Sequence, residues 1–98
     1  ICQRTSGAPA QAFARIHADQ FSYTKGEPVI FNSSEHGQRE FCAVCGSQLL
    51  YRGRQAPFDV AFNTPTLDDP SAFPPREHVW RRSRLPWFET ADTLPRKD

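Results

Sequence analysis

Short hydrophobic stretches separated by turn residues run along most of the chain. Several of them alternate apolar and polar residues, as Phe58–Phe62 does, which is typical of strands with one buried face. No stretch keeps a helical period, so the sequence predicts an all-β domain, either a β-sandwich or a folded sheet. The expected strands are Ala12–Ile16, Phe21–Thr24, Val29–Phe31, Arg39–Phe41, Leu49–Arg52, Phe58–Phe62 and His78–Arg81.

One helical turn is predicted at Asp68–Phe73. Asp69 stands where a helix N-cap is favoured, and Pro70 occupies the first helical position, where its missing N–H costs nothing. Asp68 and Asp69 could instead act as paired carboxylates, but capping is the preferred interpretation.

Length and charge limit the possible classes. The 98 residues, of which 38% are hydrophobic, suit one domain over residues 1–98 with a single modest core. No apolar run approaches the roughly eighteen residues of a membrane span, so no membrane partner is expected. The net charge of +1 gives no bulk attraction to nucleic acid, which is therefore not expected as a partner either.

The cysteine and methionine counts add two expectations. Three cysteines cannot all pair within one chain and are too few for a secreted disulfide framework, so a cytoplasmic location is expected. The absence of methionine indicates either a processed start or a fragment of a longer protein, and we prefer the fragment.

The motif Cys42-Ala43-Val44-Cys45 followed by Gly46 predicts half of a zinc site. Two residues between the thiols let both sulfurs reach one tetrahedral ion, and glycine suits a tight turn at positive φ. A redox pair would need the motif to open a helix, whereas the residues after it predict a strand. A pair of buried thiols is the other alternative, and zinc is preferred to both.

The remaining zinc ligands are not evident from spacing. A closed structural site needs four ligands, and Cys2 would supply a third if the fold brought it close. His17, His36 and His78 are conceivable ligands, although none has ligand spacing to a cysteine, and a lone histidine is more often hydrogen-bonded or solvated.

Several ordered motifs together resemble the glutathione-dependent formaldehyde-activating enzyme family, which also includes centromere protein V. The pattern of Ser33, Ser34, Gly37 and Arg39 before Cys42 fits the same family. The other matching segments are "CQRTSGAP" at residues 2–9, "FCAVCGSQL" at 41–49, "LDDPSAFPP" at 67–75 and "HVWRRSRLPW" at 78–87.

The resemblance implies zinc as cofactor and a carbon–sulfur lyase that adds glutathione to formaldehyde, giving S-hydroxymethylglutathione. It assigns Cys42 and Cys45 to a structural zinc site and Cys2 to a catalytic zinc, whose role is that of a Lewis acid and thiolate holder. The family's other cysteines have no counterpart here. We expect them upstream of Ile1, in N-terminal zinc-binding strands that this chain lacks, and expect activity to be impaired.

The resemblance also marks candidate substrate-binding residues. Ser6 and Gly7 would border the catalytic zinc, although an ordinary turn, with Ser6 bonding its own backbone, is the simpler interpretation. Arg82 and Arg84, next to Arg81, could hold carboxylates of a glutathione-like thiol, or phosphates. A solvated strand face with its tryptophans packed inward is preferred for this segment.

These features together predict a zinc-dependent lyase acting on a thiol–aldehyde adduct. The alternative is a non-catalytic zinc-binding interaction module. A homodimer is also expected, because Cys42 and Cys45 from each of two copies would complete one zinc site and exposed strand edges would pair.

Overall fold

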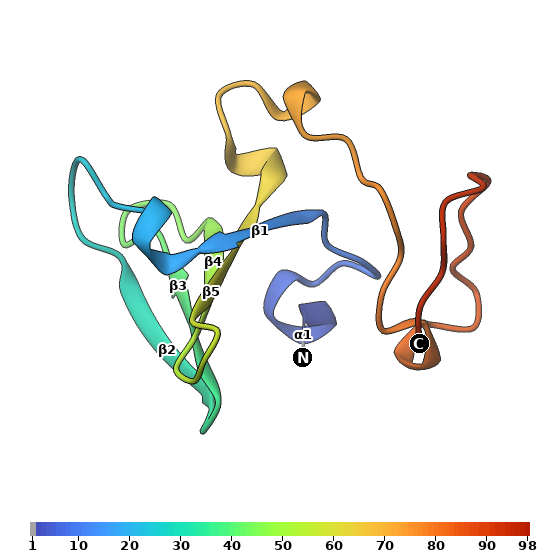
Figure 1. The fold of residues 1–98 in the computed structure, drawn as a ribbon, viewed down its shortest axis with the longest axis horizontal. Helices are drawn as coiled ribbons and strands as arrows, with labels where there is room; N and C mark the ends of the chain where they lie inside the picture. The colour runs from blue at the N-terminus through green and yellow to red at the C-terminus, as the bar shows by residue number, and fades with distance from the viewer. Residues whose placement is uncertain (1) are drawn as a thin grey trace.

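The computed structural model describes residues 2–98, and in them five antiparallel strands form one sheet (Figure 1). The all-β class is confirmed, with a single sheet rather than the two sheets of a sandwich. The strands are β1 (Phe13–His17), β2 (Val29–Ser34), β3 (Gly37–Phe41), β4 (Gln48–Gly53) and β5 (Asp59–Asn63), in the order β1-β5-β4-β3-β2.

Helical structure is limited to short segments. The α-helix α1 (Cys2–Ser6) was not predicted, because five residues are too few to show a period. The expected turn is present as η3 (Pro70–Ala72), with Asp69 at the N-cap position. Its carboxylate accepts a hydrogen bond from the Ser71 hydroxyl at 2.6 Å but makes no capping bond with a backbone amide of the helix. The other 3-10 helices are η1 (Ala18–Gln20), η2 (Thr64–Thr66) and η4 (Arg81–Ser83).

Two predicted strands are wrong. Phe21–Thr24 is not a strand, because Tyr23 turns its hydroxyl to Glu40 and packs edge-to-face on Phe21 instead of pairing. His78–Arg81 makes only an isolated parallel bridge, between His78 and Arg96. Trp80 has a φ of 58°, in the left-handed region, and this interrupts the extended chain.

The register places two rows of side chains on opposite faces of the sheet. Phe73 packs edge-to-face on Phe62 and so covers part of the face that also carries Glu40. The helix α1 lies against the opposite face, where Arg39 contacts Cys2. The Glu40 face carries Ala14, Phe62, Leu50, Glu40 and Ile30, and the Arg39 face carries Arg15, Ala61, Tyr51, Arg39 and Phe31.

A buried carboxylate occupies the Glu40 face beside the small apolar core of Leu50 and Val60. Glu40 is 2% exposed and accepts hydrogen bonds from Arg52 at 2.7 Å, Tyr23 at 2.9 Å and Gln38 at 3.0 Å. Burial alone would raise the pKa of Glu40, but these hydrogen bonds outweigh it and lower the pKa below its ordinary value. Burial and the bond to Glu40 raise the pKa of Tyr23.

On the Arg39 face, Tyr51 lies directly over Gly37. A Cβ at position 37 would overlap the Tyr51 ring, so this site requires glycine for its lack of a side chain. The guanidinium of Arg39 in turn lies over the Tyr51 ring, 5.5 Å from its centroid.

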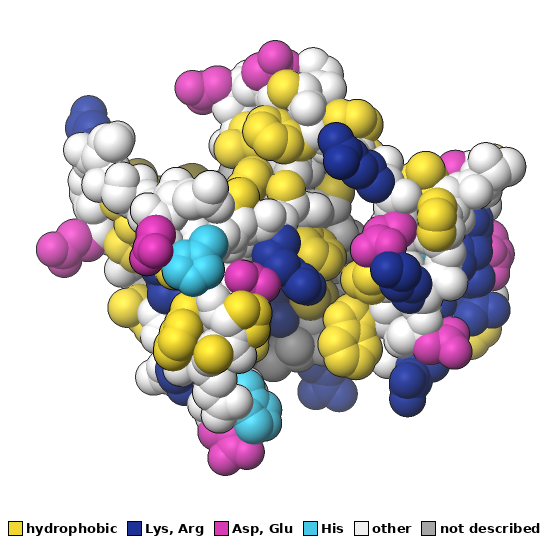
Figure 2. Space-filling view, in the orientation of Figure 1, with side chains coloured by type: hydrophobic (Ala, Val, Ile, Leu, Met, Phe, Trp, Pro, Cys, Tyr) yellow, Lys and Arg dark blue, Asp and Glu magenta, His cyan; other side chains and the backbone are white. Residues whose placement is uncertain are grey.

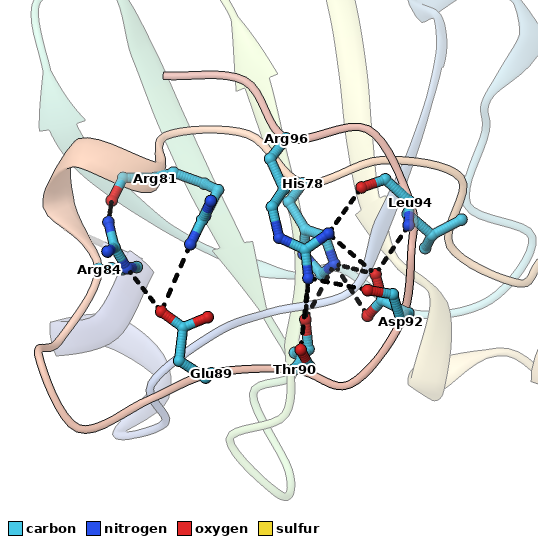
Figure 3. A network of polar contacts seen from close by, with 8 residues as sticks. All are labelled: His78, Arg81, Arg84, Glu89, Thr90, Asp92, Leu94 and Arg96. Atoms are coloured by element: carbon cyan, nitrogen blue, oxygen red, sulfur yellow. Dashed lines mark hydrogen bonds and ion pairs between the residues drawn. The ribbon is translucent and has the colours of Figure 1, made fainter.

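The C-terminal segment stands apart from the sheet, on the other side of α1 (Figure 1). It is held by a polar network around Asp92 (Figure 3). Nε2 of His78 lies 2.9 and 3.0 Å from the two Asp92 oxygens, and Arg96 lies 3.5 Å from one of them. The bond from His78 lowers the pKa of Asp92 to about 2. Among the helices of the described residues, none has the length and apolar character needed to cross a membrane.

Replacing Glu40 by glutamine is expected to destabilise the fold by about 3–5 kcal/mol, because it leaves the partly buried Arg52 charge without its partner. Urea unfolding followed by fluorescence measures the change. Glu35→Gln is the matched control, since Glu35 is exposed and, within residues 2–98, forms an ion pair only with His36, at 3.3 Å. It should shift stability by no more than about 0.5 kcal/mol. A loss for Glu40→Gln as small as that of the control would contradict the role given to Glu40.

The Asp92 carboxyl should titrate near pH 2, below the ordinary value of about 3.9. Because the folded-state pKa is lowered, the pair with His78 stabilises the fold fully above about pH 4 and loses this contribution as the pH falls toward 2. Carbon-detected NMR titration measures the pKa, which should rise in His78→Gln and stay unchanged in Asp68→Asn. An unchanged Asp92 pKa in His78→Gln would show that another group sets it.

Candidate functional site

An open groove lies between the turn after α1 and the turn that joins β3 to β4. Its volume is about 410 Å³, and its walls include Ser6, Gly46, Ser47, Gln48 and Asn63. The side-chain amide of Asn63 donates to the backbone oxygen of Gln48 at 2.8 Å, which joins the end of β5 to the start of β4. The volume is within the range of small-molecule sites, and the polar side chains in its wall can hydrogen-bond to a ligand.

The turn with Cys42 and Cys45 forms one side of this groove. The amide of Gly46 donates to the oxygen of Cys42 at 2.9 Å, and the amide of Cys42 donates to the oxygen of Ser47 at 2.9 Å. Gly46 has a φ of 79°, as the sequence led us to expect. The strand β4 follows the turn, so no helix N-terminus is present to activate a redox thiol.

The two thiols of this turn are hydrogen-bonded and accessible. Cys42 Sγ accepts from the amide of Val44 at 3.4 Å, and Cys45 Sγ lies 3.1 Å from the Ser47 hydroxyl. Hydrogen bonds from Ser47, and then from Cys42, lower the pKa of Cys45. Cys45 is exposed and Cys42 half-buried, which does not fit the alternative of two buried thiols. The turn therefore presents two sulfur donors suited to a metal ion.

A complete zinc site does not fit within residues 2–98. These residues contain no group of three or more His, Cys, Asp or Glu side chains placed to hold a metal ion. Cys2 does not join the pair on the turn but contacts Arg39. The three histidines each lie near a carboxylate instead: His17 near Asp19, His36 near Glu35 and His78 near Asp92. The described residues thus provide two thiols of the four ligands that a structural zinc needs.

Cys2 lies on α1 against a buried cation. The guanidinium of Arg39 donates to Cys2 Sγ at 3.4 Å, and Arg39 is 8% exposed. Its Nε is buried and has no hydrogen-bond partner among the described residues. No carboxylate within residues 2–98 pairs with this charge, so the Cys2 thiol is the polar group to which Arg39 is directed.

Ser6 and Gly7 form a tight turn at the end of α1. The Ser6 hydroxyl donates to the oxygen of Cys2 at 2.7 Å and accepts from the amide of Ala8 at 3.2 Å. Gly7 has a φ of 68°, which favours glycine. These bonds are those of a local turn, and Ser6 also lines the groove.

The arginines after position 80 lie on and beside η4. Arg81 and Arg84 both contact Glu89, at 3.5 and 3.2 Å, whereas Arg82 is exposed and has no ion pair within the described part of the chain. The expectation of tryptophans packed inward is wrong, because Trp80 is 70% and Trp87 73% exposed. The segment is joined to α1 by Gln3, whose side-chain amide donates to the oxygen of Ser83 at 3.2 Å.

Several residues of the site gave no sequence signal of their own. Arg39 entered the sequence analysis only as part of a family pattern, and its burial gave no local signal, because arginines in short strands are mostly exposed. Gln48 and Asn63 stand at the ends of two strands, and only the pairing of β4 with β5 brings them together.

Comparison with known proteins agrees with these features. Residues 1–83 match the sequence model of the family described as glutathione-dependent formaldehyde-activating enzyme. No curated protein and no solved structure was found to match the chain.

Proposed function

Because the chain belongs to the glutathione-dependent formaldehyde-activating enzyme family, we propose that its chemistry is that of a carbon–sulfur lyase acting on a thiol–aldehyde adduct of the S-hydroxymethylglutathione type. We propose also that this activity is impaired in the chain, because residues 2–98 do not complete a zinc site. The observation that carries this proposal is the family match, which spans residues 1–83 of 98. The groove beside Ser6 and Cys45 supports it, since a small thiol bound there would lie beside segments from both halves of the family pattern.

In the reaction, the sulfur of the thiolate attacks the carbon of formaldehyde and forms the carbon–sulfur bond. The electron pair of the carbonyl π bond moves to oxygen, which takes a proton from water, and cleavage is the reverse. We assign the polar walls at Gln48 and Asn63 to binding the amide groups of the thiol, with Ser6 and Gly7 shaping the near edge. Arg82 and Arg84 do not line the groove but flank Ser83, which Gln3 on α1 contacts, and we assign them to the carboxylates of the thiol.

The proposed cofactor is zinc, which the cysteines of the chain would help to bind. Cys42 and Cys45 would ligate a structural ion and Cys2 a catalytic one, each together with ligands that residues 2–98 do not supply. When bound, the catalytic ion would supply Lewis acidity. All three cysteines are free thiols, which agrees with a reducing compartment such as the cytoplasm.

A second candidate function is a zinc-binding interaction module without catalysis. The ligand set within residues 2–98 supports it, since Cys2 stands apart from the pair at Cys42 and Cys45. The two functions differ in turnover, because a module would bind zinc or a thiol without changing the rate of adduct formation.

Filling the groove tests the binding step. Ala10 lines the groove, so Ala10→Trp should weaken binding of S-hydroxymethylglutathione at least about tenfold by occupying the same volume. The matched control is Ala72→Trp, at an exposed position on η3 that does not line the groove. Ligand-observed NMR gives the affinities, and equal weakening in both variants would contradict the assignment of the site.

Exchange NMR of glutathione with labelled formaldehyde then tests turnover, after subtraction of the spontaneous reaction. We expect this chain to show no zinc-dependent acceleration, because its described residues do not complete a zinc site. A chelator-sensitive rate above background would contradict that expectation and decide in favour of the enzyme.

We further propose that the chain forms a homodimer. The edge strand β2 exposes Val29, Ile30 and Phe31, which are 40%, 53% and 49% accessible, and Figure 2 shows hydrophobic side chains on the surface among charged ones. An exposed apolar edge favours pairing with another strand. Two copies of the Cys42 and Cys45 turn would also provide four thiols for one zinc ion.

Equilibrium sedimentation with and without a chelator tests the shared zinc site. A dimer that dissociates on chelation, and that is lost in Cys45→Ser, is the expected result. A monomer under both conditions would contradict dimer formation, whereas a dimer insensitive to chelation would retain only strand pairing.

A further inference from the structure

The last residues of the chain form a strap, defined here as residues 89–97, along the segment that contains η4. The amide of His78 donates to the oxygen of Pro95 at 2.7 Å, and the amide of Lys97 donates to the oxygen of His78 at 2.6 Å. The amide of Arg81 donates to the oxygen of Lys97 at 3.1 Å. The strap is therefore attached through its backbone at its C-terminal end.

Asp92 anchors the middle of the strap (Figure 3). Its carboxylate can only accept hydrogen bonds, so Nε2 of His78, at 2.9 and 3.0 Å, carries the proton. The guanidinium of Arg96 also donates to two backbone oxygens, those of Leu94 at 2.7 Å and of Asp92 at 3.0 Å. His78, Arg96 and Asp92 are each about a quarter to a third exposed, so this anchor is better shielded than a surface ion pair.

Glu89, at the N-terminal end of the strap, makes a looser contact. Its Oε1 lies 3.5 Å from Arg81 and 3.2 Å from Arg84, while its Oε2 has no partner within the described residues. Glu89 is 59% and Arg84 47% exposed. Exposed ion pairs of this kind contribute little to stability, so another carboxylate can replace that of Glu89 at small cost.

The two arginines lie on a segment that contacts α1. Gln3, next to Cys2 on α1, binds Ser83 between them at 3.2 Å. Half of the twelve Lys and Arg residues lie between positions 76 and 97, and Figure 2 shows dark blue side chains gathered on this side with acidic ones among them. Arg82 adds an exposed positive charge without an ion pair in the described chain. An anion approaching α1 is therefore attracted to this segment.

We propose that Arg81 and Arg84 form a carboxylate-binding site for the thiol substrate, and that Glu89 occupies this site as an internal competitor until the substrate displaces it. The inference rests on the proposed function, because it takes a glutathione-like thiol, which carries two carboxylates, as the ligand. No covalent bond changes in this exchange. One carboxylate replaces another on the same two guanidinium groups, while Asp92 keeps the strap attached.

Isothermal titration with S-methylglutathione tests the proposal. Glu89→Gln removes the competing charge and should tighten binding by about three- to fivefold, as expected for loss of an exposed ion pair. The matched control is Glu77→Gln, which removes an equal charge from a residue that pairs with Lys97 at 2.9 Å, and its affinity should equal that of the wild type. Adding Arg84→Gln to Glu89→Gln should abolish the gain.

Three results would overturn the proposal: no gain in Glu89→Gln, an equal gain in Glu77→Gln, or no binding of S-methylglutathione by any variant. Its sulfur is methylated and cannot add to formaldehyde, so the measurement is independent of turnover. A gain in Glu89→Gln would therefore stand even if exchange NMR favoured the non-catalytic module over the lyase.

Asp92→Asn tests the anchor separately. Weakening the contact with His78 should speed hydrogen exchange at the Lys97 amide, which is bonded to the oxygen of His78. It should also tighten S-methylglutathione binding, because a loosened strap holds Glu89 less firmly on the arginines. Faster exchange with unchanged affinity would overturn the role of the strap as the carrier of the competitor.

Discussion

The fold depends on one buried negative charge. Glu40 joins β3 to β4 through Arg52 and to the segment after η1 through Tyr23, and it is almost completely removed from water. Only Leu50 and Val60 are buried apolar residues in the described chain. Because this apolar core is so small, the packing of the strands depends largely on the hydrogen bonds of Glu40. A buried charge tolerates few alternatives, because each donor left unpaired costs free energy. The network therefore selects one arrangement of strands and segment around it.

The strands β1, β2, β4 and β5 were predictable from local pattern, because each contains a short group of apolar residues, whereas β3 is mostly polar and was expected only from Arg39 to Phe41. The two wrong strands have physical causes that lie outside local pattern. Tyr23 finds a partner in Glu40, 17 positions away, and Trp80 takes a left-handed backbone conformation that alternation of side chains does not reveal. The helix α1 is held partly by the contact of Cys2 with Arg39, 37 positions away, which no local window contains.

The candidate site divides in the same way. The turn at Cys42 and Cys45 was predictable, because its spacing, its glycine and the strand after it are all local. The groove was not, because it forms where α1, the β3–β4 turn and the end of β5 meet. The strap escaped prediction because the contact of His78 with Asp92 spans an irregular segment with no period. In the sequence, the acidic residues of the strap only lower the net positive charge of the segment. In the structure, Glu89 and Asp92 contact arginines of the segment directly.

The stack of Gly37, Tyr51 and Arg39 has a consequence for how this sequence can change. A side chain at position 37 is compatible only with a smaller residue at position 51, and a smaller residue there removes the ring over which Arg39 lies. A single substitution at one of these positions is expected to lower the stability of the protein, whereas replacing all three residues together can avoid this loss. The three positions are therefore expected to vary together, so that a homologue keeps all three residues or replaces all three.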